Sequence, residues 1–196
     1  MPLKIAVTGN IGSGKTTVCK IFEILDVPVF YADKQAKIVL NSPEVIPQLI
    51  DLFDTVIINP KGGIDRQKLA SIVFNDKEKL NQLNGIIHPK VYEKFDLWVK
   101  QQTHAPYCLM EAALIFESGS QKKFDKTILV NAPVEMMKKR VKERDKVSEK
   151  EVINRMKNQM SQEEKMKLAD YHVVNDGKTL IIPQIIKLDK IFRSKN

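Results

Sequence analysis

The chain has 196 residues and a mass of 22.4 kDa, which suits one domain with insertions and is too little for two full domains. Hydrophobic residues make up 43% and charged residues 29% of the chain, and this composition excludes an intrinsically disordered protein. The net charge of +8 comes from 27 lysines and five arginines set against 24 acidic residues. Because lysine supplies most of the positive charge, the few arginines are candidates for specific roles.

Strand-like and helix-like segments alternate along the chain, which is typical of an α/β domain with a parallel sheet. Strands are expected at residues 4–8, 29–31, 107–111, 126–130 and 171–174. A helix follows the first strand, with Val18, Ile21, Phe22 and Leu25 on one face, and a last helix is expected near residues 178–192. Phe22, Phe74 and Phe116 are expected in the core.

Two regions interrupt this alternation. Residues 34–104 contain too many helical residues for a simple crossover, which predicts a helical insertion. Residues 133–168 form a second helical stretch, in which Ser148/Glu151 and Ser161/Glu164 have the spacing of capping boxes. We therefore expect several short helices there, a form suited to a mobile lid.

The segment from Gly9 to Thr16 (GNIGSGKT) fits G-x-x-x-x-G-K-[ST] at every fixed position, between a strand and an amphipathic helix. Glycines let backbone N–H groups surround phosphate oxygens, Lys15 reaches the β- and γ-phosphates, and Thr16 is a ligand for Mg²⁺. The sequence thus predicts a nucleotide site with Mg²⁺, formed by Gly12, Ser13, Gly14, Lys15, Thr16 and Thr17. The D-x-x-G and N-K-x-D motifs of a guanine-nucleotide switch are absent from the sequence.

The expected architecture is a three-layer αβα P-loop NTPase core with a five-stranded parallel sheet. A single domain would span residues 1–196, with its core at about 1–33, 105–132 and 169–196. The insertion at about 34–104 and the lid at about 133–168 would complete it.

Asp33 follows the second expected strand, and the carboxyl ends of parallel strands open onto the ligand crevice. A carboxylate at this place can accept a proton from an attacking hydroxyl or hold that hydroxyl in line. The alternative is that Asp33 only caps a helix beginning at Lys34.

Several stretches together resemble the dephospho-CoA kinase family nearly end to end. Its T-G-G-I-G-S-G-K-S/T-T motif matches residues 8–17, with Asn10 for the second glycine. Its D-A-D segment appears as Tyr31-Ala32-Asp33, which keeps the final Asp. Its D-R-x-x-L…L-N-x-I-x-H-P run and its D-V-P-L-L-F-E match residues 65–89 and 111–117. Its R-x-x-x-R…R-x-x-Q pattern is similar to residues 140–159, although Arg155 and Gln159 are one residue further apart than in the family. Its A-D-x-x-x-x-N-x-G pattern is similar to residues 169–177.

The resemblance implies ATP-dependent phosphorylation of the 3′-hydroxyl of dephospho-CoA to give CoA and ADP, the final step of coenzyme A biosynthesis. It also implies that Asp33 acts at the acceptor hydroxyl, that Arg66 and His88 help to hold the acceptor, and that Asn175 lies near the adenine. For His88 the alternative is a packed or helix-capping histidine. Glu111 stands where the family has Asp, which leaves open whether it binds Mg²⁺ directly or through water.

Arg140 and Arg144 are four residues apart on an expected helix, so both guanidinium groups can lie on one face. Guanidinium forks suit phosphate oxygens and developing transition-state charge, which predicts a catalytic role for Arg140 beside Lys15 and an ATP-binding role for Arg144. The alternative is a solvated basic face, and for Arg155 the two readings stay open.

The runner-up enzyme is a nucleoside monophosphate kinase, and the rival from another class is a basic P-loop ATPase that binds RNA. Aromatic residues make up only 7% of the chain, and no K/R-G-F run is present, which argues against RNA. We expect no nucleic-acid partner, no membrane segment, a monomer and, because Cys19 and Cys108 form no C-x-x-C pair, free thiols in the cytoplasm.

Overall fold

The computed structural model describes residues 1–73 and 76–194, and the chain divides into two compact units. The first unit comprises Met1–Tyr31 and Val99–Asn196, and the second comprises Ala32–Trp98. Phe74, expected in the core, lies outside the described residues.

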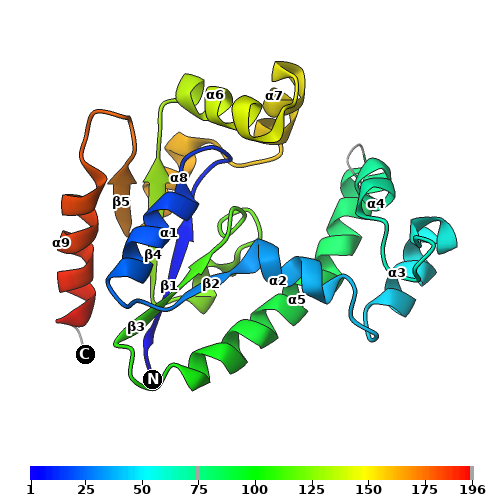
Figure 1. Cartoon of the computed structure of the whole chain (residues 1–196), viewed down its shortest axis with the longest axis horizontal. Coiled ribbons are helices and arrows are strands. Elements are labelled where there is room, and N and C mark those ends of the chain that lie inside the picture. The colour runs from blue at the N-terminus through cyan, green and yellow to red at the C-terminus, as the bar shows by residue number, and fades with distance from the viewer. Residues whose placement is uncertain (74–75, 195–196) are drawn as a thin grey trace. The chain divides into compact units, whose positions relative to one another are not determined.

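The first unit is built on a five-stranded sheet in the order β2-β3-β1-β4-β5, and every neighbouring pair is parallel (Figure 1). Its strands are β1 (Leu3–Thr8), β2 (Val29–Tyr31), β3 (Tyr107–Glu111), β4 (Lys126–Asn131) and β5 (Tyr171–Val174). This confirms the expected α/β class with a parallel sheet. These strands are parallel, so the segments that follow them all begin at the same end of the sheet, the end formed by the strands' carboxyl termini. Because β1 lies between β3 and β4, these three segments are neighbours there.

One face of the sheet is covered by α1 (Lys15–Ile24) and α9 (Ile181–Arg193). Phe22 of α1 and Phe192 of α9 both meet the ring of Tyr107 edge-on, with ring centroids 6.3 and 5.2 Å away. The Tyr107 hydroxyl donates a 2.6 Å hydrogen bond to Asp189, which satisfies the polar end of this buried ring. Phe22 and Phe116 are buried, as expected.

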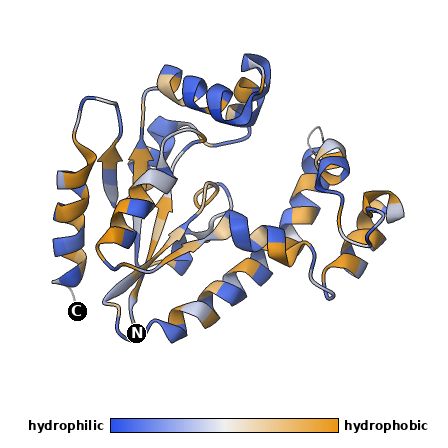
Figure 2. Cartoon of the chain, viewed as in Figure 1, coloured by the Kyte–Doolittle hydropathy of each residue, from blue (hydrophilic) through white to orange (hydrophobic). Residues whose placement is uncertain are grey.

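After β4 the chain forms α6 (Val134–Asp145), α7 (Glu149–Lys157) and α8 (Gln162–Leu168). Ser148 and Ser161 both cap their helices with reciprocal bonds to the glutamates three residues later, which confirms both capping boxes. Figure 2 shows that α6 is predominantly hydrophilic, whereas β4 is hydrophobic. A helix that is polar over most of its surface can face solvent or a polar ligand there.

The second unit contains α2 (Ala32–Val39), α3 (Ile46–Phe53), a 3₁₀ turn at Thr55–Ile57 and α4 (Arg66–Val73), and α5 (Lys77–Gln101) leads out of it. Asp65 caps α4 by accepting hydrogen bonds from the N–H groups of Gln67 and Lys68. Across the described parts of the chain, no helix combines the length and apolar character that a membrane crossing requires.

The last helix begins at Ile181, three residues later than expected. The Asp176 carboxylate accepts hydrogen bonds from the N–H groups of Lys178 and Thr179 and from the Thr179 hydroxyl. An Asp side chain that bonds to the backbone two and three residues onward stabilises a turn in competition with a helix. These residues are therefore held in a turn.

Candidate active site

The loop from Gly9 to Gly14 joins β1 to α1. Gly12 has a φ of 81° and Gly14 a φ of 94°, in the left-handed region that favours glycine. Close neighbours also exclude a side chain at both: a Cβ on Gly12 would lie 2.5 Å from the Met137 carbonyl oxygen, and one on Gly14 would collide with the Asn175 amide nitrogen. Backbone conformation and packing both require glycine at these two positions, of which Gly14 is a fixed position of the motif and Gly12 is not.

Helix α1 begins directly after this loop, and its first turn is open for an anion. Gly14 is the N-cap residue, no side chain caps the helix, and its first turn contains no acidic residue. The positive end of the helix dipole and the first N–H groups therefore remain available to a phosphate. The Lys15 ammonium lies over the loop, 2.8 Å from the Gly9 carbonyl oxygen and 3.3 Å from that of Asn10.

Thr16 and Glu111 form the pair of oxygen groups beside this loop. The Thr16 hydroxyl donates a 2.9 Å hydrogen bond to Glu111 Oε1. Glu111 ends β3 and is in register with Val7 of β1 and Tyr31 of β2, which explains how a residue 95 positions away reaches the loop. A hydroxyl and a carboxylate are hard oxygen ligands of the kind that Mg²⁺ prefers. The structure brings together the two residues that the sequence assigned to a metal.

Arg140 and Asn175 close the opposite side of the loop. Arg140 donates through Nη2 to Asn175 Oδ1 at 3.1 Å and through Nη1 to the carbonyl oxygens of Gly12 and Ser13 at 3.4 and 3.5 Å. The Asn175 amide nitrogen donates a 2.8 Å hydrogen bond to the Ser13 carbonyl oxygen. Asn175 is buried, and through these two hydrogen bonds its side-chain amide connects the loop to the guanidinium group of Arg140 in α6.

Arg144 does not share these contacts. Its Nε lies 2.7 Å from Asp145 Oδ1, and Arg155 Nη1 lies 2.8 Å from Asp145 Oδ2. The Arg144 hydrogen bond is the largest cause that holds the pKa of Asp145 below its usual value, and Arg155 adds to it. Arg144 and Arg155 thus converge on one carboxylate at the end of α6, and the Arg144 side chain is 62% exposed.

Asp33, Arg66 and His88 belong to the second unit. Helix α2 begins at Ala32, so Asp33 lies inside its first turn and is not the N-cap of a helix beginning at Lys34, because the helix starts two residues earlier. Arg66 is the exposed first residue of α4. His88 lies within α5 and does not cap it, and burial lowers its pKa.

Four residues with polar contacts in this region were not predicted from the sequence: Asn10, which lies in the loop itself, and Glu117, Asp145 and Lys165. The Asn10 amide donates to the Met160 carbonyl oxygen at 3.0 Å, and the Ile11 N–H donates to Gln159 Oε1 at 2.8 Å. Lys165 forms a buried ion pair with Glu117. The 111–117 match contained a signal for Glu117, whereas nothing singles out one lysine among 27.

Comparison with known proteins gives consistent matches over most of the chain. The family model described as dephospho-CoA kinase matches residues 3–180. A dephospho-CoA kinase of Bacteroides fragilis is 36% identical over 189 residues, covering 96% of this chain and 92% of that protein. One of Aquifex aeolicus is 39% identical over 175 residues, covering 89% of each.

A solved structure agrees with this result. The dephospho-CoA kinase of Campylobacter jejuni superposes with a TM-score of 0.71 at 28% identity and covers 100% of both chains. The chain therefore belongs to the dephospho-CoA kinase family, whose members phosphorylate dephospho-CoA with ATP in the final step of coenzyme A biosynthesis.

Proposed function

We propose that this chain transfers the γ-phosphoryl group of ATP to the 3′-hydroxyl of dephospho-CoA, with the loop of residues 9–14 as the nucleotide site. The observation that carries the proposal is the grouping around one open helix end. Thr16 and Glu111 lie on one side of the loop, and Arg140 and Asn175 lie on the other. Phosphoryl transfer needs little covalent chemistry from the protein and depends on positioning and charge stabilisation, which this grouping supplies.

Magnesium fits the Thr16–Glu111 pair. The two side chains already place a hydroxyl and a carboxylate oxygen 2.9 Å apart at the head of α1, and both are oxygen ligands. A magnesium ion held there would neutralise charge on the β- and γ-phosphate oxygens. Hydrogen bonding between the two residues keeps the Glu111 carboxylate directed at the loop.

Lys15 and Arg140 provide positive charge for the transferred group. The Lys15 ammonium now contacts carbonyl oxygens of the loop, and phosphate oxygens would replace these weaker acceptors. The Arg140 guanidinium offers a planar fork that suits the charge spread over equatorial oxygens. We assign three groups of residues to nucleotide binding: Gly12, Ser13 and Gly14 of the loop, Lys15, Thr16 and Thr17 of α1, and Arg144 with Asn175.

We assign the acceptor to residues of the second unit. Asp33 would hold the 3′-hydroxyl and take its proton, and Arg66 and His88 would contact the rest of dephospho-CoA. Asp33 follows the last residue of β2, Tyr31, by two positions, and Tyr31 is in register with Glu111. Asp33 is exposed, and a proton acceptor must be reachable by the substrate.

We further propose that the enzyme works as a monomer in the cytoplasm, without a nucleic-acid partner. A single chain supplies the loop, the Thr16–Glu111 pair and the Arg140 guanidinium. Cys19 and Cys108 are both buried free thiols, as suits a reducing compartment. Burial is the main cause that raises the pKa of Cys108 to about 11, which keeps this thiol unreactive.

The test measures ADP release with Mg-ATP and four candidate acceptors: dephospho-CoA, AMP, CMP and single-stranded RNA. We expect kcat/KM to be highest for dephospho-CoA, and Lys15→Met serves as the background for contaminating kinases. A faster reaction with AMP or CMP would contradict the assignment and favour a nucleoside monophosphate kinase. ADP release stimulated by RNA alone would favour the RNA-binding ATPase.

A further inference from the structure

Lys165 in α8 is the one lysine with a fully buried side chain in the part of the chain that the structure describes. Its Nζ lies 2.8 Å from Glu117 Oε1 and donates to the Ala113 carbonyl oxygen at 3.1 Å. Taking a charged ammonium group out of water is unfavourable unless a partner compensates for it. A surface lysine on α8 would avoid this cost, so the buried position calls for a role.

The partners of Lys165 lie on the segment that follows β3. This segment starts one residue after Glu111, where the Ala112 N–H donates to the Val7 carbonyl oxygen at 3.1 Å. The Ala113 carbonyl oxygen accepts a second hydrogen bond, 3.2 Å long, from the hydroxyl of Thr8, the last residue before the phosphate loop. Lys165 and Thr8 together thus fix the main chain two residues beyond the carboxylate that meets Thr16.

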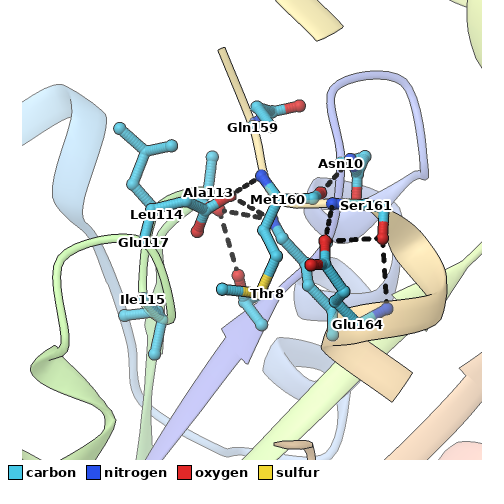
Figure 3. A network of polar contacts seen from close by, with 12 residues as sticks. Thr8, Asn10, Ala113, Leu114, Ile115, Glu117, Gln159, Met160, Ser161 and Glu164 are labelled. Carbon is cyan, nitrogen blue, oxygen red and sulfur yellow. Dashed lines mark hydrogen bonds and ion pairs between the residues drawn. The ribbon is translucent and has the colours of Figure 1, made fainter. Parts of the chain in front are cut away.

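Glu117 links the same ion pair to the connection between α7 and α8. Besides Lys165, its Oε1 accepts a 2.9 Å hydrogen bond from the Met160 N–H, and the Met160 carbonyl oxygen accepts from the Asn10 amide at 3.0 Å. Figure 3 shows Ala113 and Glu117, both from the segment after β3, close to Thr8 and Met160 from two other segments of the chain. The network therefore joins the post-β3 segment, the α7–α8 connection and the phosphate loop.

The capping box at Ser161 fixes the start of α8 and thereby the position of Lys165. Ser161 accepts from the Glu164 N–H and donates to the Glu164 carboxylate at 2.7 Å, which fixes the first turn next to Lys165.

Glu117 Oε2 is buried and has no hydrogen-bond partner among the described residues. The charge of Glu117 is therefore balanced mainly by Lys165.

We propose that Lys165 is a positioning residue, whose ion pair with Glu117 and bond to Ala113 hold Glu111 beside Thr16 in the geometry that accepts the metal-bound nucleotide. The inference rests on the proposed function. Lys165 itself touches neither ATP nor acceptor; it acts through the main chain that carries Glu111. Supporting groups of this kind commonly change metal affinity or activity by about 10–100-fold when removed.

The test separates positioning from folding by removing both charges. In Lys165→Met alone, Glu117 would be left buried without its counterion, and the variant would be destabilised. The double variant Lys165→Met with Glu117→Gln contains no buried charge, and replacing a buried ion pair by neutral groups of similar volume is often tolerated. Lys167→Met is the matched control, because it makes the same substitution at an exposed position of α8.

The main readout is nucleotide affinity measured by calorimetry with and without Mg²⁺ and in the absence of acceptor. In the double variant we expect ATP affinity in EDTA to change by less than about threefold, while the gain that Mg²⁺ brings falls about tenfold or more. Lys167→Met should match the wild type in both. Thr8→Val, which removes only the hydroxyl bond to Ala113, should weaken the Mg²⁺ effect in the same direction.

A stable double variant with an unchanged Mg²⁺ effect would overturn the proposal and leave Lys165 as a structural ion pair. If the double variant melts below the assay temperature, Thr8→Val decides, and an unchanged Mg²⁺ effect in that variant overturns the proposal equally. Since these measurements need no acceptor, they are independent of the identity of the acceptor. Loss of the proposed function itself would show in the wild type, as a failure to phosphorylate dephospho-CoA.

Discussion

Replacing Arg140 by lysine keeps the positive charge but removes the fork. The guanidinium group contacts two sets of acceptors, Asn175 through Nη2 and the loop carbonyl oxygens of Gly12 and Ser13 through Nη1. An ammonium group can occupy only one of these places. The loss of one hydrogen bond made by a charged group, worth about 1.5–3 kcal/mol, corresponds to a fall in kcat/KM of roughly 10–150-fold.

Steady-state kinetics with dephospho-CoA and a thermal melt on the same preparation check this prediction. Arg140→Met should lose more, on the order of 10³-fold, because no charge remains for the transition state. Lys139→Met is the control, because it removes the same charge from the same helix at a side chain that is 76% exposed. Unchanged kinetics in Arg140→Lys would show that the guanidinium fork is not needed for phosphoryl transfer, and a large fall in melting temperature would assign Arg140 to folding instead.

Asp33→Asn should lower kcat by roughly 10²-fold, the lower part of the range for a lost general base, while ATP affinity by nucleotide titration stays unchanged; near-normal kcat would sink the assignment. Glu111→Gln keeps the size and loses the charge, so we expect the Mg²⁺ concentration for half-maximal activity to rise at least about tenfold; an unchanged Mg²⁺ profile would remove Glu111 from the metal site. Burial of Asp170 opposes its ionisation, but the hydrogen bonds from Thr127 and Lys126 outweigh this and lower its pKa. A lowered folded-state pKa stabilises the fold above about pH 4 and loses this effect as the pH falls further, so the destabilisation by Asp170→Asn in urea unfolding should shrink at acid pH; a constant difference would contradict this.

The strands were largely predictable because each is a short apolar run bounded by turn residues, as in the segment before the phosphate loop. Both capping boxes were predictable for a similar reason, because Ser148 with Glu151 is a local pattern whose partners lie one turn apart. The start of α9 was not predicted, since the turn at Asp176 competes with the helix through side-chain hydrogen bonds. The order of the strands in the sheet depends on contacts between distant residues, and no local pattern encodes it.

The phosphate loop and the Thr16–Glu111 pair follow from motifs, because glycine, lysine and a strand-ending acid have fixed positions there. The pairing of Arg144 with Asp145 was not predicted: the helical spacing of Arg140 and Arg144 says that they can share a face, but the neighbouring carboxylate attracts Arg144 away. The burial of Lys165 could not be predicted either, because it depends on an ion pair with Glu117, 48 residues earlier in the chain.

Phosphorylation of the 3′-hydroxyl of dephospho-CoA is the activity proposed for this chain. The most direct test is to incubate the protein with Mg²⁺, dephospho-CoA and ATP labelled in its γ-phosphate, and to locate the label in the product by ³¹P NMR and mass spectrometry. We expect one labelled phosphate per product molecule, on the 3′-oxygen of the ribose, and no label transfer in Lys15→Met. Label on another hydroxyl, or label released only as inorganic phosphate, would contradict it.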